Sequence, residues 1–485
     1  MMEYRSCTSM LVAAKASLDG SIMIARNEDG PSVYSPVLLE IVKHLPAEEA
    51  PKTWKGFNKT EFELPPRERL RHTRLPEADE SIDGAYASAG FNEAGVAMSA
   101  TESIYGGNRA LAYDPMIPEG VQESVIPDLV LPYIHSAREG VEVLADYIKK
   151  YGSAEGNGIL FADPNECWYM EIPTGHHWAA IRIPVDQIAV APNMAMIQAL
   201  NLKDHENVMC SEGLEDFVRQ HHLDTRLAPD GFINFRCCFG TCDESDRIYN
   251  TPRAWDAIRR LAPNLCQKNN WHPLSTDIPF TYKAEEKIAV TDVMDIMGAH
   301  FEESEYDPLG RLGTPQSRTR FRPISVCKTE ESHILQIFPD APEGMRNILW
   351  LCIGAAAFSP YIPFFADVEK APESYAKADE HPNMNQAFWL MRTYDYFAET
   401  LRFEKAHTVF SLKNKLRQQG LARVEEVRQE LKEKALTGEA LMRYLEEANE
   451  KTAGLFISSV NEALTDLMKY AFESSKLSYK MNPDL

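Results

Sequence analysis

The apolar positions in the first half of the chain fall in short alternating runs separated by turn residues. Residues 8–15 are β-branched and apolar, residues 18–21 read Leu-Asp-Gly-Ser, and residues 22–25 are apolar again. Alternation on both sides of a glycine-containing turn is typical of a β-hairpin. The same pattern returns at residues 85–101, 158–172 and 176–193, and further strands are expected at residues 34–43, 324–328, 333–337 and 348–353. Consecutive hairpins predict antiparallel sheets rather than a series of β-α-β units.

Two segments between these strands have helical spacing instead. Residues 122–136 fit one helix, and residues 140–151 fit another with an apolar face that includes Val141, Leu144 and Ile148.

The longest apolar run covers residues 347–366 and approaches the length of a membrane-spanning helix. It contains Gly354, Pro360 and Pro363, which interrupt a helix. We therefore interpret it as a buried strand and loop, and we expect no membrane segment.

From about residue 385 onward the pattern becomes helical. Leu421, Val424, Val427 and Leu431 keep helical spacing, and Lys and Glu fill the other faces. This pattern indicates helices packed on the main domain or on another subunit rather than catalytic elements. We expect a main domain over residues 7–384, a helical extension over residues 385–485, and assembly into a homo-oligomer.

Composition and charge indicate which classes of binding partner are unfavourable for this protein. Of the 485 residues, 44% are hydrophobic and 25% are charged, which is typical of a globular protein. Acidic residues outnumber basic ones by 72 to 50, giving a net charge of −22, so nucleic acid and anionic membranes are unfavourable partners. The nine cysteines have no disulfide-like spacing and no apolar signal region opens the chain, which predicts a cytoplasmic location.

The sequence has no motif for a nucleotide cofactor and no recognised metal-binding spacing. Glycine-rich phosphate loops of the Gly-x-Gly-x-x-Gly and Walker types are absent, and so is a Gly-x-Ser-x-Gly elbow. The segment Cys237-Cys238-Phe239-Gly240-Thr241-Cys242 and the pairs His176-His177 and His221-His222 lack the spacing of zinc ligands. We expect neither a cofactor nor a metal.

The first predicted hairpin carries the best candidate for a catalytic nucleophile. Cys7 opens its first strand, and Arg26 and Asp29 close its second strand. Pairing of the two strands brings both charged residues near the thiol, and a guanidinium favours the reactive thiolate. If residues 1–6 were removed, the α-amine of Cys7 would become a base of nearly neutral pKa. The alternative is that Cys7 is an ordinary buried apolar residue.

Three later segments are unusual for core packing. Asn193 ends the apolar run Val190-Ala191-Pro192 with a side-chain amide suited to an oxyanion. Arg253 stands in the first turn of a predicted helix, where the helix dipole does not favour a positive charge. Asp307 lies in Tyr306-Asp307-Pro308, directly after a run of acidic residues. Each of them can equally be a cap, a turn residue or a surface charge.

These segments together resemble a known family, the bacterial cysteine dipeptidases of the dipeptidase A type. That family belongs to the N-terminal nucleophile (Ntn) hydrolases, with bile acid hydrolases and penicillin V acylases as distant relatives. The resemblance rests on an ordered set of motifs between residues 7 and 366, namely Cys7-Thr8-Ser9, Ala25-Arg26-Asn27-Glu28-Asp29, Phe91-Asn92-Glu93-Ala94-Gly95-Val96, Ala191-Pro192-Asn193, Tyr249-Asn250-Thr251-Pro252-Arg253, Tyr306-Asp307-Pro308, Arg322-Pro323-Ile324, Glu331-Ser332-His333 and Tyr361-Ile362-Pro363-Phe364.

The resemblance implies an α+β fold, a four-layer αββα sandwich of antiparallel sheets, with self-cleavage that removes residues 1–6 as a propeptide. It implies that Arg26 and Asp29 orient the nucleophile and its amine. Asn193 would contribute to the oxyanion site or hold the α-amine, and Arg253 would complete the polar network. The acylases' other oxyanion asparagine has no clear counterpart, since Thr101 stands near its place.

The function implied is that of a cysteine dipeptidase that cleaves dipeptides through a thioester on Cys7. One alternative is an Ntn amidase or acylase for a different amide. Another is a non-catalytic interaction protein similar to the secernins, which resemble these dipeptidases and act in secretion.

Overall fold

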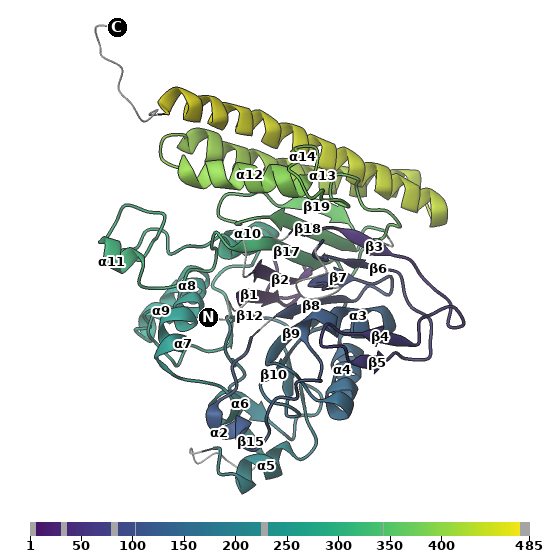
Figure 1. Cartoon of the computed structure of the whole chain (residues 1–485), viewed down its shortest axis with the longest axis vertical. Helices are drawn as coiled ribbons and strands as arrows, with labels where there is room; N and C mark the ends of the chain where they lie inside the picture. Colours follow the sequence, from purple (N-terminus) through teal and green to yellow (C-terminus); the bar gives the residue numbers. More distant parts are fainter. Residues whose placement is uncertain are drawn as a thin grey trace.

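Two antiparallel sheets stacked face to face form the centre of the molecule (Figure 1). The computed structural model describes residues 6–30, 36–78, 86–101, 103–224, 231–342 and 344–475. The larger sheet has the strand order β16 (Thr281–Tyr282), β12 (Ile188–Ala191), β1 (Ser6–Val12), β2 (Ile22–Asp29), β17 (Thr329–Ile337), β18 (Asn347–Ile353) and β19 (Ile362–Phe365). The smaller sheet has the order β14 (Val208–Cys210), β11 (Ala179–Arg182), β10 (Cys167–Ile172), β9 (Asn157–Ala162), β8 (Ala97–Thr101) and β7 (Ala89–Phe91).

Helices cover the outer face of each sheet, so the fold has four layers. On the smaller sheet, α3 (Ile126–Val130) and α4 (Ala137–Tyr151) pack on β8, β9 and β10. On the larger sheet, α10 (Val290–Met297) packs on β2 and β17, and α12 (Ala387–Thr400), α13 (Ala406–Lys434) and α14 (Gly438–Ser474) pack on β18 and β19. Both faces of the larger sheet are covered. Its strands β1, β2, β17 and β18 are therefore buried along their whole length. The predicted αββα fold with a helical extension is confirmed.

The other elements lie in the connections between these layers. The two-stranded sheets are β3 (Glu40–Val42) with β6 (His72–Arg74), β4 (Thr53–Lys55) with β5 (Glu61–Glu63), and β13 (Ala199–Asn201) with β15 (Phe232–Asn234). The short helices are α2 (Asn108–Leu111), η1 (Glu123–Val125), η2 (Leu131–Tyr133), α5 (Leu214–Gln220), α6 (Phe235–Phe239), α7 (Glu244–Tyr249), α8 (Thr251–Leu261), α9 (Pro263–Lys268) and α11 (Pro315–Arg318).

The first hairpin forms as its sequence predicts. Strands β1 and β2 pair with Cys7 opposite Glu28, Ser9 opposite Arg26 and Val12 opposite Met23. In the turn, Asp19 Oδ1 accepts hydrogen bonds from Ser17 Oγ at 2.7 Å and from the Ser21 backbone N–H at 3.0 Å. Gly20 has φ of +77°, a conformation that glycine adopts without strain.

Three predicted elements differ from the structure. Residues 122–136 form the short pieces η1, α3 and η2 instead of one helix, because Pro127 and Pro132 interrupt the backbone hydrogen bonds. The predicted strand at residues 324–328 is irregular.

The third difference changes the topology. Strands β11 and β12, predicted as one hairpin at residues 176–193, belong to different sheets: β11 pairs with β10 and β14, whereas β12 pairs with β1 and β16. The chain crosses from one layer to the other between them, and this crossing brings Asn193 beside β1.

The C-terminal helices close the outer edge of the larger sheet. Strand β19 is one of the two edge strands of this sheet, and α13 and α14 lie across it (Figure 1). The buried Asn449 of α14 accepts a hydrogen bond from the Phe365 backbone N–H at 2.9 Å and donates one to the Phe365 carbonyl oxygen at 2.9 Å. The apolar run at residues 347–366, predicted as a buried strand and loop, forms two buried strands, β18 and β19, joined by a loop. No helix in the described ranges is long and apolar enough to span a membrane.

Replacement of Asn449 by Leu should destabilise the whole fold rather than the extension alone. The substitution leaves the amide and carbonyl groups of Phe365 buried without this partner, and each unsatisfied group costs about 1–3 kcal/mol. Urea unfolding should show a loss of about 2–5 kcal/mol in one cooperative transition. Asn461→Ala, on the same helix, is the matched control and should change stability little. A separate early transition of the C-terminal helices would contradict this expectation.

Candidate active site

Cys7 lies buried near the start of β1, between β12 and β2 of the larger sheet. Three of its atoms contact side chains from distant parts of the chain. Arg26 Nη1 donates to Cys7 Sγ at 3.2 Å, the Cys7 N–H donates to Asn193 Oδ1 at 3.1 Å, and Arg253 Nη1 donates to the Cys7 carbonyl oxygen at 2.5 Å. The thiol and both backbone polar groups of this residue are therefore fixed in place.

Arg26 holds the thiol from β2 and is itself held by two carboxylates. Its Nη1 also donates to Glu123 Oε1 at 3.0 Å, and its Nη2 donates to Glu28 Oε2 at 2.9 Å. Complete burial disfavours the charge, but Cys7, Glu28 and Glu123 outweigh burial and raise the pKa of Arg26 well above its usual value. The guanidinium stays charged next to Sγ, where a positive charge favours the thiolate.

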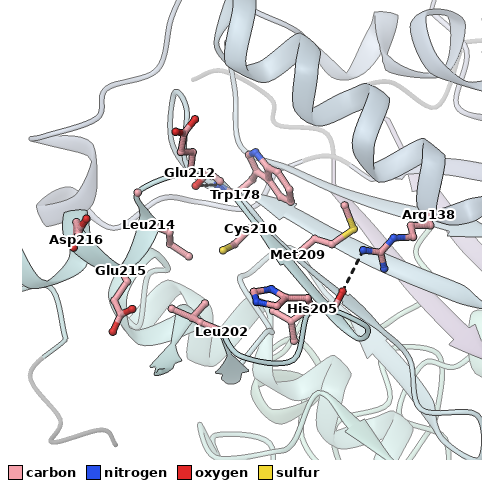
Figure 2. A pocket seen from close by; sticks show the side chains of 13 residues that line it. Arg138, Trp178, Leu202, His205, Met209, Cys210, Glu212, Leu214, Glu215 and Asp216 are labelled. Carbon is pink, nitrogen blue, oxygen red and sulfur yellow. Dashed lines mark hydrogen bonds between the residues drawn. The ribbon is translucent and has the colours of Figure 1, made fainter. Parts of the chain in front are cut away.

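Other cysteines have surroundings that disfavour a thiolate. Burial raises the pKa of Cys167 and Cys352 far above the usual value. Burial and the nearby Glu215 also raise the pKa of Cys210. Cys210 lines a cavity of about 520 Å³ together with Trp178 and His205 (Figure 2). None of the five predicted site residues lines this cavity.

Arg253 and Asn193 reach Cys7 from outside the hairpin. Asn193 directly follows β12, and Arg253 lies in the first turn of α8 with its side chain completely buried. Arg253 Nη2 donates to Asn193 Oδ1 at 2.9 Å and to Asn250 Oδ1 at 2.5 Å, and its Nη1 donates to Thr8 Oγ1 at 2.8 Å. Burial, together with the neighbouring Arg322, lowers the pKa of Arg253, although an arginine stays protonated in proteins. The side-chain oxygen of Asn193 is thus directed toward the Cys7 nitrogen and Arg253.

Asp29 lies opposite Ser6, the residue directly before Cys7. Its carboxylate forms an ion pair with Arg322 and accepts a hydrogen bond from Thr329 Oγ1 at 2.5 Å. Burial raises the pKa of Asp29, and Arg322 and Thr329 offset part of this effect. Asp29 therefore holds the strand at Ser6, the residue before Cys7. Its carboxylate binds Arg322 rather than the thiol.

The structure adds residues that the sequence analysis did not assign to the site. Arg322 belongs to a motif that was noted without a role, whereas Glu123 and Tyr86 carried no signal at all. Tyr86 OH donates to Glu123 Oε1 at 2.8 Å, so it supports the carboxylate that holds Arg26. Asn250 immediately precedes α8, and its Nδ2 donates to the Asn193 carbonyl oxygen at 3.0 Å. These residues come from η1, from the N-cap of α8 and from connecting segments, and the packing of these segments beside the first hairpin brings them together.

Several other candidates have separate contacts. Asp307 Oδ1 pairs with His300 Nδ1 at 2.8 Å and accepts from the Leu309 N–H at 2.8 Å, as a turn residue does. His176 Nδ1 pairs with Asp114 Oδ1 at 2.8 Å, and His177 Nδ1 pairs with Ser211 Oγ at 2.9 Å. The side chain of Thr101 lies outside the described part of the structure.

A group of buried acidic residues lies close to this network. Within the described ranges, Glu28, Glu77 and Glu330 form the one set of potential metal-ligand side chains, with carboxylate oxygens within 4.8 Å of one another. Carboxylate oxygens are ligands of the type that Mg²⁺ and Ca²⁺ prefer. Through Glu28 this group is connected to Arg26.

Glu171 anchors the loop that carries Asn193. It lies completely buried on β10 of the smaller sheet, and its Oε1 accepts from the backbone N–H of Met196 at 2.5 Å and of Ile197 at 3.3 Å. Burial raises the pKa of Glu171 to about 8, and the two N–H donors and Arg236 offset part of this effect. The two sheets are thus joined through the segment that follows Asn193.

Comparison with known proteins gives matches over most of the chain. The family described as Peptidase family C69 matches residues 6–411. A probable dipeptidase from Latilactobacillus sakei is 39% identical over 100% of this chain and 99% of its own length. A probable dipeptidase B from Lactococcus lactis is 36% identical over 98% of each chain. Among solved structures, penicillin V acylase from Agrobacterium tumefaciens is 13% identical with a TM-score of 0.32, covering 75% of this chain and 87% of the acylase.

The buried Glu171 should make stability depend on pH. A carboxyl group whose pKa is raised to about 8 stabilises the fold at low pH, and this contribution is lost as the pH rises from about 4.5 through about 8. The stability of wild type relative to Glu171→Gln should therefore fall over this range, by at most about 1.4 kcal/mol per pH unit. Urea unfolding of both proteins between about pH 5 and pH 8 measures the difference. Parallel pH dependences would show that the pKa of Glu171 is not raised in the folded protein.

Proposed function

The chain belongs to peptidase family C69, and we propose that it is a dipeptidase whose nucleophile is the thiolate of Cys7. The proposal rests above all on one contact, the charged guanidinium of the completely buried Arg26 at 3.2 Å from Cys7 Sγ. A fixed positive charge at this distance favours the thiolate and holds it in one direction. The proposed substrate class comes from relatives named probable dipeptidase, probable dipeptidase B and dipeptidase A, which match this chain over 98% to 100% of their own lengths.

In the proposed mechanism Cys7 Sγ attacks the carbonyl carbon of the dipeptide. The peptide nitrogen leaves with a proton, and the N-terminal residue of the substrate stays on Sγ as a thioester. Water then cleaves the thioester and restores the thiol. Arg26 holds the sulfur through both steps, because its guanidinium is fixed by Glu28 and Glu123.

The proton acceptor proposed for this reaction is the α-amine of Cys7. That amine exists only after the bond between Ser6 and Cys7 is cleaved, so we propose removal of residues 1–6. Residues 1–5 lie outside the described part of the chain, whereas Ser6 is described. The Cys7 nitrogen already donates to Asn193 Oδ1 at 3.1 Å, which is the contact an amine at this position would keep. An amine of pKa about 7.7–8.0 is a suitable base near neutral pH.

The side-chain oxygen and the side-chain N–H group of Asn193 have separate roles in this proposal. Its oxygen holds the Cys7 nitrogen, and its amide N–H group is the proposed donor to the oxyanion that forms on the substrate carbonyl. Arg253 fixes the amide by donating to the same oxygen at 2.9 Å. Asp29 acts indirectly, through Arg322 and the entry to β1.

The substitution Cys7→Ala tests the proposal, with Cys242→Ser as the matched control at an exposed cysteine. Cys7→Ala should lower kcat/KM for dipeptides by at least about 1,000-fold, since the covalent route is lost, and Cys242→Ser should keep wild-type activity. A panel of dipeptides, N-acylated amino acids and penicillin V identifies the substrate class. Dipeptide hydrolysis that survives Cys7→Ala would refute the mechanism, and a clear preference for penicillin V would refute the substrate class.

A further inference from the structure

The peptide bond between Ser6 and Cys7 is held on both of its sides. On the Cys7 side, the nitrogen, the carbonyl oxygen and the sulfur contact Asn193, Arg253 and Arg26. On the Ser6 side, Arg322 Nη2 donates to Ser6 Oγ at 3.0 Å. The same Nη2 forms the ion pair with Asp29, which lies opposite Ser6 in the strand ladder.

The Arg322 guanidinium has little freedom to move. Its Nη1 donates to the carbonyl oxygens of Pro323 at 2.6 Å and Ile324 at 3.2 Å, so its own backbone fixes its direction. The guanidinium also lies over the Tyr249 ring at 5.4 Å from the ring centroid, and the side chain is 9% exposed. A guanidinium held by backbone, ring and carboxylate can orient a small hydroxyl group that docks on it.

We propose that Arg322 and the Ser6 hydroxyl form a clamp that positions the Ser6–Cys7 bond for self-cleavage. The cleavage removes Ser6, so the clamp is lost in the mature protein. Arg322 is then a positioning residue for maturation, and Ser6 is its partner only in the precursor. This inference rests on the proposed function, because it presupposes that residues 1–6 are removed. After removal, Arg322 keeps its contacts with Asp29 and with Thr8 Oγ1, the latter at 3.4 Å.

The step that the clamp would assist is a transfer of the Ser6 acyl group. Cys7 Sγ attacks the Ser6 carbonyl carbon, an S–C bond forms, the C–N bond breaks, and the thiol proton passes to the Cys7 nitrogen. Water then adds to the thioester, residues 1–6 leave with a new carboxylate on Ser6, and Sγ regains a proton. A fixed approach between sulfur and carbonyl carbon speeds the first step, since the two groups are held in a reactive geometry.

Ser6→Ala tests the clamp without altering the mature enzyme. Because Ser6 leaves with the propeptide, wild type and Ser6→Ala give the same mature chain from Cys7 onward. Full-length chains are made in a cell-free system, samples are quenched in acid, and intact mass gives the fraction processed over time. Ser6→Ala should slow processing by about tenfold or more, the effect expected from losing a hydrogen bond to a charged group. Ser6→Thr keeps the hydroxyl and should process near the wild-type rate.

The other outcomes overturn either the clamp alone or the clamp together with the processing step. Processing of Ser6→Ala at the wild-type rate, or of Ser6→Thr as slowly as Ser6→Ala, overturns the clamp and leaves the proposed function intact. A mature Ser6→Ala enzyme whose kcat/KM differs from wild type also overturns it, because the serine would then act through folding. A wild-type chain that is active while keeping residues 1–6 overturns the processing step of the proposed function and the clamp with it.

A double-mutant cycle shows whether Arg322 is the partner of Ser6. Arg322→Lys retains a positive charge near Asp29 but not the two-pronged guanidinium, so it should also slow processing. If the two residues act together, Ser6→Ala should slow the Arg322→Lys chain by clearly less than it slows wild type. Equal fold-changes in the two backgrounds overturn the pairing.

Discussion

Burial of charge around one thiol is the constraint on which this structure depends. Arg26 and Arg253 are completely buried, and each contacts an atom of Cys7. A buried guanidinium without partners is costly, so every one of these charges needs acceptors at fixed positions. The hydrogen-bonded acceptors come from β1, β2, η1 and the turns beside β12 and α8. The site therefore depends on the larger sheet, η1 and α8 being in place together.

The stacked sheets provide that rigid surrounding. Strand β1 lies between β12 and β2, so the register of its two neighbours places Asn193 and Arg26 relative to Cys7. Glu171 joins the smaller sheet to the segment after Asn193, and Asn449 joins the C-terminal helices to the edge of the larger sheet. Each tie joins neighbouring layers by hydrogen bonds between a buried side chain and backbone groups.

Local features of the sequence predicted more of the fold than of the site. The hairpin over residues 6–29 was predictable because its turn and both strands are adjacent in the chain. The prediction of one helix over residues 122–136 was wrong. The spacing of apolar residues does not show that Pro127 and Pro132 interrupt the backbone hydrogen bonds of a helix. The assignment of β11 and β12 to one hairpin was wrong because alternation alone does not say which sheet a strand joins.

The site residues also divide into those that are close in the sequence and those that come from distant segments. Cys7, Arg26 and Asp29 could be grouped from the hairpin, whereas Asn193 and Arg253 required a family resemblance. Arg322 stands 293 residues from its partner Asp29 and Glu123 stands 97 residues from Arg26, so no local pattern could connect them. Sequence spacing does not encode contacts made by the packing of separate layers.

Trapping the covalent intermediate tests the central claim most directly. Wild-type enzyme is mixed with an excess of dipeptide, quenched in acid within its turnover time, and digested for mass analysis. The account predicts that the N-terminal residue of the dipeptide is attached to a peptide that begins at Cys7. Attachment to a different residue, or an active enzyme in which Cys7 is still preceded by Ser6, would contradict it.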